Sequence, residues 1–302
     1  MKRYLAKIKK KIYKLFHPSI GEILMLHRVV NERSLLEANR LMEVTPEFLE
    51  KTIVGYLEQG RPIISLDEVS EIVNKRKKLK QPFVCFTFDD GYKDNYELAY
   101  PIFKKYNVPF AIYVTTDFIQ GKGILWWYLL EKLLLNNDLL VLSDGTTYNV
   151  ETIDEKSACF YEIRSRLSKV MSNNAQTVFE ELFKGYLFSM DSMTKYLIMN
   201  EEQVEELASD SICTIASHGV SHSYLANLSS EQLLYELSNS KLKLEELTGN
   251  DIFHFAYPYG QYNDYCLKAV ENCGYKTSVL AWGGAVRKFE SVYKMNRVLV
   301  VE

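Results

Sequence analysis

The pattern of hydrophobic and polar residues predicts short buried strands that alternate with amphipathic helices. Strands are expected where apolar and β-branched residues cluster between turn residues, at 23–30, 61–66, 84–88, 109–114, 212–216, 252–256, 277–280 and 298–300. Helices are expected where apolar residues recur at helical spacing, at 46–59, 92–106, 201–209, 230–248 and 264–273. Repeated strand, helix, strand units favour right-handed parallel crossovers, so the pattern predicts an α/β fold.

This alternation is interrupted between residues 120 and about 201. The segment contains Trp126 and Trp127, a leucine-rich helix, a predicted hairpin around residues 143–145, and further helices. We interpret it as an insertion that forms a lid or a wall over a binding site. A purely structural or oligomerising helical subdomain explains the same pattern equally well.

Two adjacent carboxylates, Asp89 and Asp90, follow the apolar stretch 84–88 and precede Gly91. Neighbouring carboxylates are costly unless a cation shares them, and a chain that turns at the strand end can aim both at one metal ion and one water. The alternative is an ordinary Asp-Asp-Gly surface turn. The hexapeptide 86–91 alone leaves both interpretations open.

A second polar cluster, at residues 217–222, places His218 and His222 four positions apart. On a helical turn such positions share one face, about 5–6 Å apart at Cβ, which is a spacing typical of metal ligands. Two imidazoles and one carboxylate, with room left for water, suit Zn²⁺ or a related divalent ion. Surface or hydrogen-bonded core histidines are the alternative, although two of only five histidines fall within this hexapeptide.

The residues 87–91 (TFDDG), followed by 217–222 (SHGVSH) and 255–260 (FAYPYG), resemble three motifs of the metal-dependent polysaccharide deacetylases, carbohydrate esterase family 4. The resemblance extends from about residue 23 to the C-terminus, and the order of the three motifs is more specific than any one of them. It implies a distorted (β/α) barrel with a helical insertion between the first and second motifs. In such a barrel, residues that follow the strands meet at one face.

The resemblance also implies roles for individual residues. Asp89 would be the base that activates water, and Asp90, His218 and His222 would be the metal ligands. The backbone N–H of Tyr259 would help to hold the oxyanion. In the subset of the family that acts on poly-N-acetylglucosamine, a similar apolar segment ending in His supplies the catalytic acid. That role falls here on His27, for which a structural histidine at a strand end is the alternative.

The sequence departs from the family pattern at two places. Many members carry an Arg in the third motif that holds the catalytic Asp, whereas this chain has Ala256 there. Arg297 is the first candidate to take its place and Arg28 is the second. The usual late His motif is absent because no histidine follows His254, which we interpret as structural. The acid is therefore expected to be His27, and the alternative is an enzyme that is slow or altered.

Composition narrows the class of protein. A chain of 302 residues with 47% hydrophobic content can bury a large core. A net charge of −3 gives no indication of nucleic-acid binding. The five cysteines are scattered without a C-x-x-C pair, which indicates free thiols in a reducing compartment.

The first residues of the chain are basic and amphipathic. Seven Lys or Arg are interleaved with apolar residues in 1–16, so this segment is expected either to contact an anionic membrane surface peripherally or to pack as a solvated helix. No secretory signal and no span of ~20 apolar residues is recognised, and a cytoplasmic location is expected. The expected division is an N-terminal segment 1–20 and a catalytic domain 21–302 that is interrupted at about 120–200.

The predicted activity is metal-dependent removal of N-acetyl groups from a sugar of a cell-surface or capsular polysaccharide or its precursor. Zn²⁺ is the expected ion, with Co²⁺, Ni²⁺ or Fe²⁺ as alternatives. The competing hypotheses are a catalytically weak or inactive carbohydrate-binding homologue, motivated by Ala256, and an O-acetyl esterase, because the same metal and base serve either bond.

Overall fold

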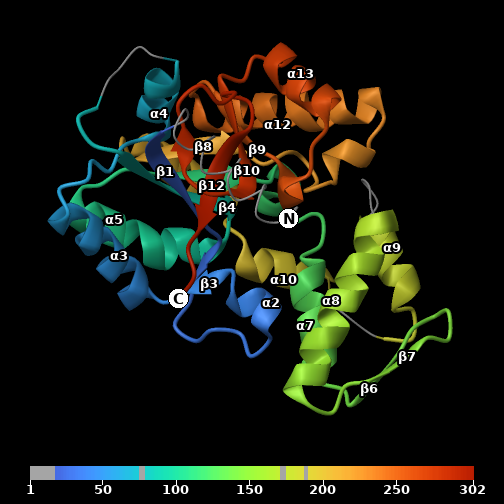
Figure 1. Cartoon of the computed structure of the whole chain (residues 1–302). Helices are drawn as coiled ribbons and strands as arrows, with labels where there is room; N and C mark the ends of the chain where they lie inside the picture. The colour runs from blue at the N-terminus through green and yellow to red at the C-terminus, as the bar shows by residue number, and fades with distance from the viewer. Residues whose placement is uncertain (1–17, 75–78, 171–174, 187–189) are drawn as a thin grey trace, which may run out of the picture.

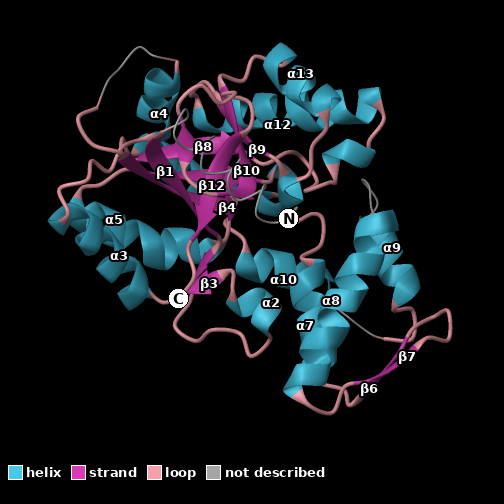
Figure 2. Ribbon diagram, viewed as in Figure 1, coloured by secondary structure: helices cyan, strands magenta, loops and turns pink. Residues whose placement is uncertain are grey.

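The computed structural model describes residues 18–74, 79–170, 175–186 and 190–302. At its centre, seven parallel strands close into a barrel in the order β1, β12, β10, β9, β8, β5 and β4, with β4 pairing back onto β1. Helices surround these strands (Figures 1 and 2). The predicted (β/α) barrel is confirmed.

The barrel strands match the apolar segments of the sequence. They are β1 (Ser19–Leu26), β4 (Phe83–Asp90), β5 (Phe110–Val114), β8 (Cys213–Ser217), β9 (His254–Ala256), β10 (Thr277–Gly283) and β12 (Met295–Leu299). The short strand β11 (Val286–Arg287) pairs antiparallel with β1, and β2 (Arg28–Val29) pairs with β3 (Glu43–Val44) outside the barrel. All eight residues of β4 are buried, as expected for a parallel strand that is covered on both faces.

The helices around the barrel are α2 (Glu37–Arg40), α3 (Pro46–Glu58), α4 (Leu66–Val73), α5 (Tyr100–Tyr106), α6 (Thr116–Ile119), α11 (Glu201–Ser209), α12 (Ser230–Thr248) and α13 (Asp264–Asn272), with the π-helix η1 (Asn95–Ala99) and the 3-10 turns η2 (Leu225–Asn227) and η3 (Pro258–Gly260). Several of these helices, namely α3, α4, α11, α12 and α13, begin at a side-chain cap. Ser229 caps α12 through a reciprocal capping box with Gln232, and α12 ends at Gly249 in the left-handed conformation.

The predicted strand at 61–66 is wrong. Within it, Ile63 forms only an isolated bridge with Val84, and α4 begins at Leu66. The Ser65 hydroxyl accepts from the Glu68 N–H, and the Glu68 carboxylate accepts from the Ser65 N–H, both at 3.2 Å. This local capping box sets the helix start, because it satisfies two backbone groups that a strand would have to pair elsewhere.

The described residues of the segment 120–200 form a helical unit beside the barrel (Figure 1), and they share a second hydrophobic core with Leu36, Ala38 and Tyr224. The elements of this unit are α7 (Trp126–Leu135), β6 (Leu139–Val141), β7 (Thr147–Asn149), α8 (Ile153–Val170), α9 (Ala175–Leu182) and α10 (Met190–Leu197). The strands β6 and β7 are the hairpin predicted around residues 143–145.

Most of the predicted N-terminal segment, residues 1–17, lies outside the described residues. Ser19 and Ile20 already belong to β1, so the barrel starts before the predicted boundary at residue 21. All five cysteines are free, as expected. Within the described part of the chain, no helix combines the length and the apolarity needed to cross a bilayer.

Candidate active site

The register of the barrel brings the predicted site residues to one end. In the strand register, Asp90 on β4 pairs with Val114 on β5, and Val114 pairs with Ser217 on β8. On the other side of β4, Phe88 is level with Leu26, the last residue of β1. The residues that end or directly follow these strands therefore meet at the carboxyl ends of the barrel strands, where barrel enzymes place their active sites.

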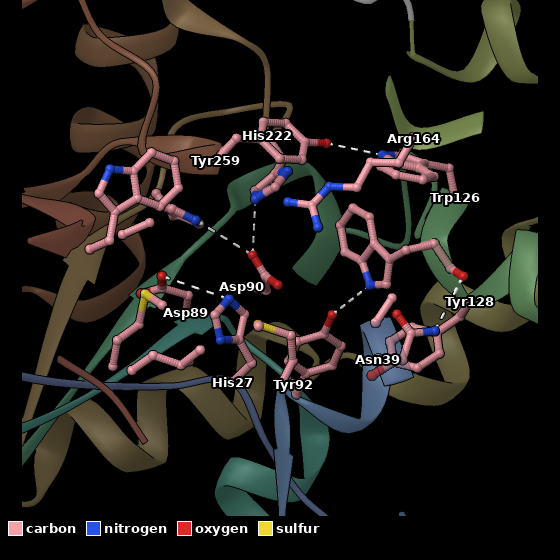
Figure 3. A pocket seen from close by; sticks show the side chains of 18 of the residues that line it. His27, Asn39, Asp89, Asp90, Tyr92, Trp126, Tyr128, Arg164, His222 and Tyr259 are labelled. Atoms are coloured by element: carbon pink, nitrogen blue, oxygen red, sulfur yellow. Dashed lines mark hydrogen bonds and ion pairs between the residues drawn. The ribbon is translucent and has the colours of Figure 1, made fainter. Parts of the chain in front are cut away.

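A cavity of about 260 Å³ opens at this end of the barrel. Six of the predicted residues line it: His27, Asp89, Asp90, His218, His222 and Tyr259. Figure 3 labels all of these except His218, together with aromatic residues of the cavity wall. Arg297, the seventh predicted residue, lies against Asp89 and is 1% exposed.

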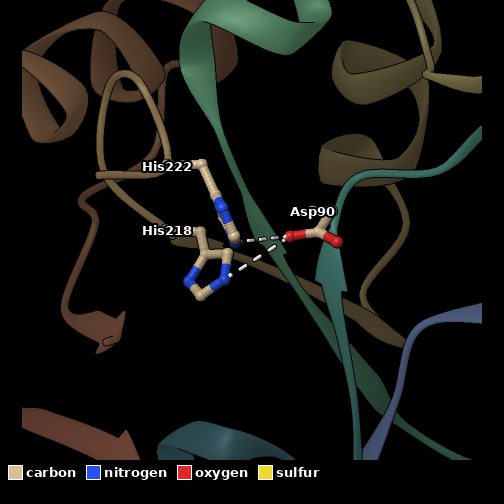
Figure 4. Close-up of side chains that lie close together, drawn as sticks. All are labelled: Asp90, His218 and His222. Atoms are coloured by element: carbon tan, nitrogen blue, oxygen red, sulfur yellow. Dashed lines mark ion pairs between the residues drawn. The ribbon is translucent and has the colours of Figure 1, made fainter. Parts of the chain in front are cut away.

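Asp90, His218 and His222 converge on one point (Figure 4). Asp90 Oδ1 lies 3.5 Å from His218 Nε2 and 3.1 Å from His222 Nε2. His218 Nδ1 lies 2.8 Å from the carbonyl oxygen of Ala256, which can only accept, so Nδ1 carries the proton and the Nε2 lone pair is free. This arrangement fixes the His218 ring in the tautomer that a metal ligand needs.

The chemistry of these three groups fits a divalent cation. Asp90 Oδ1 is buried and has no hydrogen-bond partner within the described residues, although two ring nitrogens point at it. Burial lowers the pKa of His218 to about 4, so the ring is neutral near pH 7. Burial alone would raise the pKa of Asp90, but the adjacent His222 and the other histidines lower it, so the carboxylate is ionised. Two imidazoles and one carboxylate form a typical site for Zn²⁺ or a similar ion.

The two histidines meet without a helix, which corrects the expected helical turn. Residues 218–222 form a loop in which Gly219 has φ 84° and His222 has φ 57°. The ring centroids of His218 and His222 nevertheless lie 4.9 Å apart. Glycine suits position 219 because its φ lies in the left-handed region and because a Cβ there would lie 2.9 Å from Glu236 Oε2.

Glu236 on α12 supports this loop from behind and was not predicted from the sequence. Its Oε2 accepts the backbone N–H groups of Val220 at 2.7 Å and Ser221 at 3.1 Å, and Oε1 accepts the Ser221 hydroxyl. The signal in the sequence is an acidic residue on the buried stripe of α12, between Leu233 and Leu237. A charge on that stripe is expected only where donors satisfy it.

Asp89, the neighbour of Asp90 on β4, is held by Arg297. The Arg297 guanidinium donates from Nη1 to Oδ1 at 2.7 Å and from Nη2 to Oδ2 at 2.6 Å. Burial alone would raise the pKa of Asp89, but the charge of Arg297 reverses the shift and lowers it below its usual range. His27 Nε2 lies 4.0 Å from Asp89 Oδ2, on the cavity side.

Neither of the other positions considered, Arg28 and Ala256, supplies an arginine that holds Asp89. Arg28 pairs with Asp94 at 2.7 Å and lies near Glu43, so it does not contact Asp89. Ala256, at the position of the family's motif arginine, is buried in the core inside the barrel. Arg297 therefore supplies from β12 the guanidinium that Ala256 cannot supply from β9.

Tyr259 lies at φ 56° in the turn η3, and its ring forms part of the cavity wall. The ring stacks on Tyr224 with centroids 3.9 Å apart and meets the His222 ring edge-on at 4.5 Å. Its hydroxyl accepts from Trp126 Nε1 at 3.0 Å. The segment 257–260 (YPYG) thus packs directly against His222, a candidate metal ligand.

His254 lies outside this cavity. It is buried, with Nδ1 2.7 Å from the Thr277 hydroxyl and Nε2 3.1 Å from an Asp67 carboxylate oxygen. These contacts fit the structural interpretation made from the sequence.

Residues of the insertion complete the cavity wall. Trp126, Trp127 and Tyr128 of α7 and Phe160 and Arg164 of α8 line it. Trp127 Nε1 donates to the Tyr92 hydroxyl at 3.0 Å, which connects the insertion to the segment after β4. Of the two interpretations of this segment, the geometry favours a wall of the site.

The statistical model of the family named "Polysaccharide deacetylase" matches residues 76–152 and 170–278, more than half of the chain. The chain therefore belongs to the polysaccharide deacetylase family. It is 25% identical over 283 residues to YxkH of Bacillus subtilis (strain 168), a protein whose name describes it as a candidate polysaccharide deacetylase, and the match covers 94% of this chain and 72% of YxkH.

Solved structures of other proteins share the fold, and two of them illustrate the likeness. The deacetylase PplD of Streptococcus pyogenes, solved in complex with acetate, superposes with a TM-score of 0.64 at 19% identity, over 93% of this chain and 92% of PplD. A de-N-acetylase of Aggregatibacter actinomycetemcomitans superposes with a TM-score of 0.61 at 16% identity, over 93% of this chain and 95% of that protein. At these identities the likeness establishes the fold.

Proposed function

We propose that this protein is a metal-dependent hydrolase that removes N-acetyl groups from a sugar of a cell-surface or capsular polysaccharide or its precursor. The proposal depends chiefly on one observation, the convergence of Asp90 Oδ1 with the Nε2 atoms of His218 and His222 beside Asp89 in one cavity. The names of two structural neighbours, a deacetylase with acetate and a de-N-acetylase, support the choice of bond.

In the proposed mechanism Asp90, His218 and His222 hold the divalent ion, for which Zn²⁺ is our choice. When bound, such an ion polarises a carbonyl oxygen and lowers the pKa of a coordinated water toward ~7. Asp89 accepts a proton from the attacking water. The two hydrogen bonds from the Arg297 guanidinium keep this carboxylate ionised and oriented.

Two further residues act on the substrate side of the bond. The backbone N–H of Tyr259 donates to the oxyanion that forms when water adds to the acetyl carbonyl, a contact typically worth about 3–4 kcal/mol. His27, in its protonated form, gives its proton to the departing nitrogen as the C–N bond breaks. The products are acetate and a free amino sugar.

The test is acetate release by metal-stripped protein reloaded with Zn²⁺, Co²⁺, Ni²⁺ or Fe²⁺. N-acetylglucosamine oligomers and O-acetylated glycans are compared as substrates. We expect metal-dependent release from the N-acetylated oligomers and its loss in Asp90→Asn, whereas Asp264→Asn, which removes an exposed carboxylate, retains wild-type activity. Release from esters alone would replace the proposal with an O-acetyl esterase. Glycan binding without any release would replace it with a carbohydrate-binding homologue.

A further inference from the structure

Arg164 extends from the insertion into the cavity of the candidate active site. It lies on α8 and lines the cavity, and Figure 3 shows its guanidinium directed toward the middle, on the side of Trp126 and Tyr259. Phe160, one turn earlier on α8, stacks on the Trp126 ring with centroids 6.2 Å apart. This contact fixes the part of the helix that carries Arg164 against the wall of the site.

The Arg164 side chain makes no hydrogen bond or ion pair within the part of the chain that the structure describes. Other described arginines do have such partners, namely Arg28, Arg33, Arg40, Arg61, Arg166 and Arg297. Arg166, two residues further along α8, pairs with Asp144. An arginine without a partner that projects into a substrate-sized cavity is therefore unusual in this molecule.

The acidic residues of the cavity do not neutralise Arg164. Asp89 is paired with Arg297, and Asp90 faces two histidines. On its side of the cavity lies the phenol of Tyr259, which stacks on Tyr224 outside the cavity lining, and burial raises the pKa of both phenols, to about 12 for Tyr224. Both phenols are neutral near pH 7, so the exposed Arg164 cation borders an uncharged aromatic wall and remains open to an incoming anion.

We propose that Arg164 binds an anionic group, a phosphate or a carboxylate, that is carried by or linked to the N-acetylated sugar. A guanidinium offers paired donors that match the oxygens of either group, and its charge is independent of pH in the physiological range. The inference rests on the proposed function and narrows the substrate class to acidic N-acetylated glycans or phosphate-linked sugar precursors. It also gives the insertion a role in substrate selection.

The test separates anion binding from deacetylation. Binding of glucose 1-phosphate, glucuronate and neutral methyl glucoside, none of which has an acetyl group to lose, is measured by ligand-observed NMR on the full chain. We expect at least one charged sugar to bind on the order of tenfold more tightly than methyl glucoside, and the charged sugar that is preferred distinguishes a phosphate from a carboxylate. Arg164→Gln removes this preference, and Arg164→Lys retains part of it. Lys169→Gln, which removes an exposed charge from the same helix, keeps the wild-type preference.

The same variants are then compared as catalysts. With N-acetylglucosamine 1-phosphate and neutral chitotetraose as substrates, the ratio of the two kcat/KM values is expected to fall about tenfold in Arg164→Gln. Equal binding of charged and neutral sugars by the wild-type protein, or a preference that persists in Arg164→Gln, would overturn the anion site. Failure of the proposed function has a different signature, because anion binding would then persist without acetate release.

Discussion

Arg297 and Asp89 are joined by two charged hydrogen bonds, although 208 positions separate them in the sequence. Both side chains are almost fully buried. Arg297 also donates from Nε to the Leu280 carbonyl at 2.7 Å and from Nη1 to the Thr87 hydroxyl at 3.1 Å, so the guanidinium has little freedom to turn. The pair keeps the Asp89 carboxylate ionised inside a barrel that would otherwise favour the neutral acid.

Replacing Arg297 tests this relationship. Arg297→Ala leaves a buried carboxylate unpaired and is expected to lower the free energy of unfolding by about 3–5 kcal/mol. Arg297→Lys keeps a positive charge but loses the bidentate contact with Asp89. We therefore expect kcat to drop roughly 10–100-fold, with a smaller loss of stability than in Arg297→Ala. Denaturant unfolding and acetate release measure the two effects. Arg166→Lys, at the partly exposed pair with Asp144, serves as control and should change stability by less than about 1 kcal/mol. A wild-type kcat in Arg297→Lys would contradict the role.

The proposed role of His27 as the catalytic acid can be tested by changing the leaving group of the substrate. His27→Gln is expected to lower kcat on N-acetylated sugars by about 10²–10⁴-fold, because an amine departs poorly without a proton donor. An activated acetyl ester with a phenolate leaving group needs little protonation, so the same variant should lose much less activity on it. Steady-state kinetics on both substrates provides the comparison. Equal losses on the two substrates would show that His27 does not act as the acid.

Glu236→Gln tests the support of the histidine loop. The amide keeps the size of the side chain but replaces one acceptor with a donor that faces backbone N–H groups. We expect metal affinity to fall about 10–100-fold, as is typical when a group that orients metal ligands is altered. Competition with a chelating indicator measures that affinity without turnover. Glu231→Gln, an exposed change on the same helix, should leave it unchanged, and an unaltered affinity in Glu236→Gln would refute the supporting role.

The stability of the metal-free protein should depend on pH through His218. Its pKa is about 4 in the folded protein and ordinarily 6.5, so between these values the unfolded chain binds a proton that the folded chain does not. Stability contributed by the neutral ring is present above pH 6.5 and is lost as the pH falls toward 4, by up to about 3 kcal/mol. Asp89 titrates lower, because its pKa lies below the ordinary 3.8.

Unfolding of chelator-treated protein from pH 7 to about pH 3 measures this loss. His218→Gln should flatten the dependence in that window while leaving the loss below pH 3.8 in place. A slope that is unchanged in His218→Gln would assign the acid sensitivity to other groups.

The sequence by itself determined the barrel, the three motifs and most of the site. Asp89, Asp90, His218 and His222 could be predicted because each ends or follows an apolar strand, and the ends of parallel strands meet at one edge regardless of the rest of the fold. The helix 230–248 was predicted with its bounds unchanged because its caps are local in sequence. The prediction of a strand at 61–66 was wrong because a local capping box begins a helix at the end of that segment.

Only the tertiary structure decided which side chains support and surround these groups. Arg297 rather than Arg28 reaches Asp89 because β12 and β4 flank β1 in the closed barrel, a fact that no local pattern contains. Glu236 supports the histidine loop, and Arg164 enters the cavity, because separate helices pack onto it from outside the motifs. Such contacts depend on the packing of residues far apart in the chain, whereas strands, caps and motifs depend on neighbours along it.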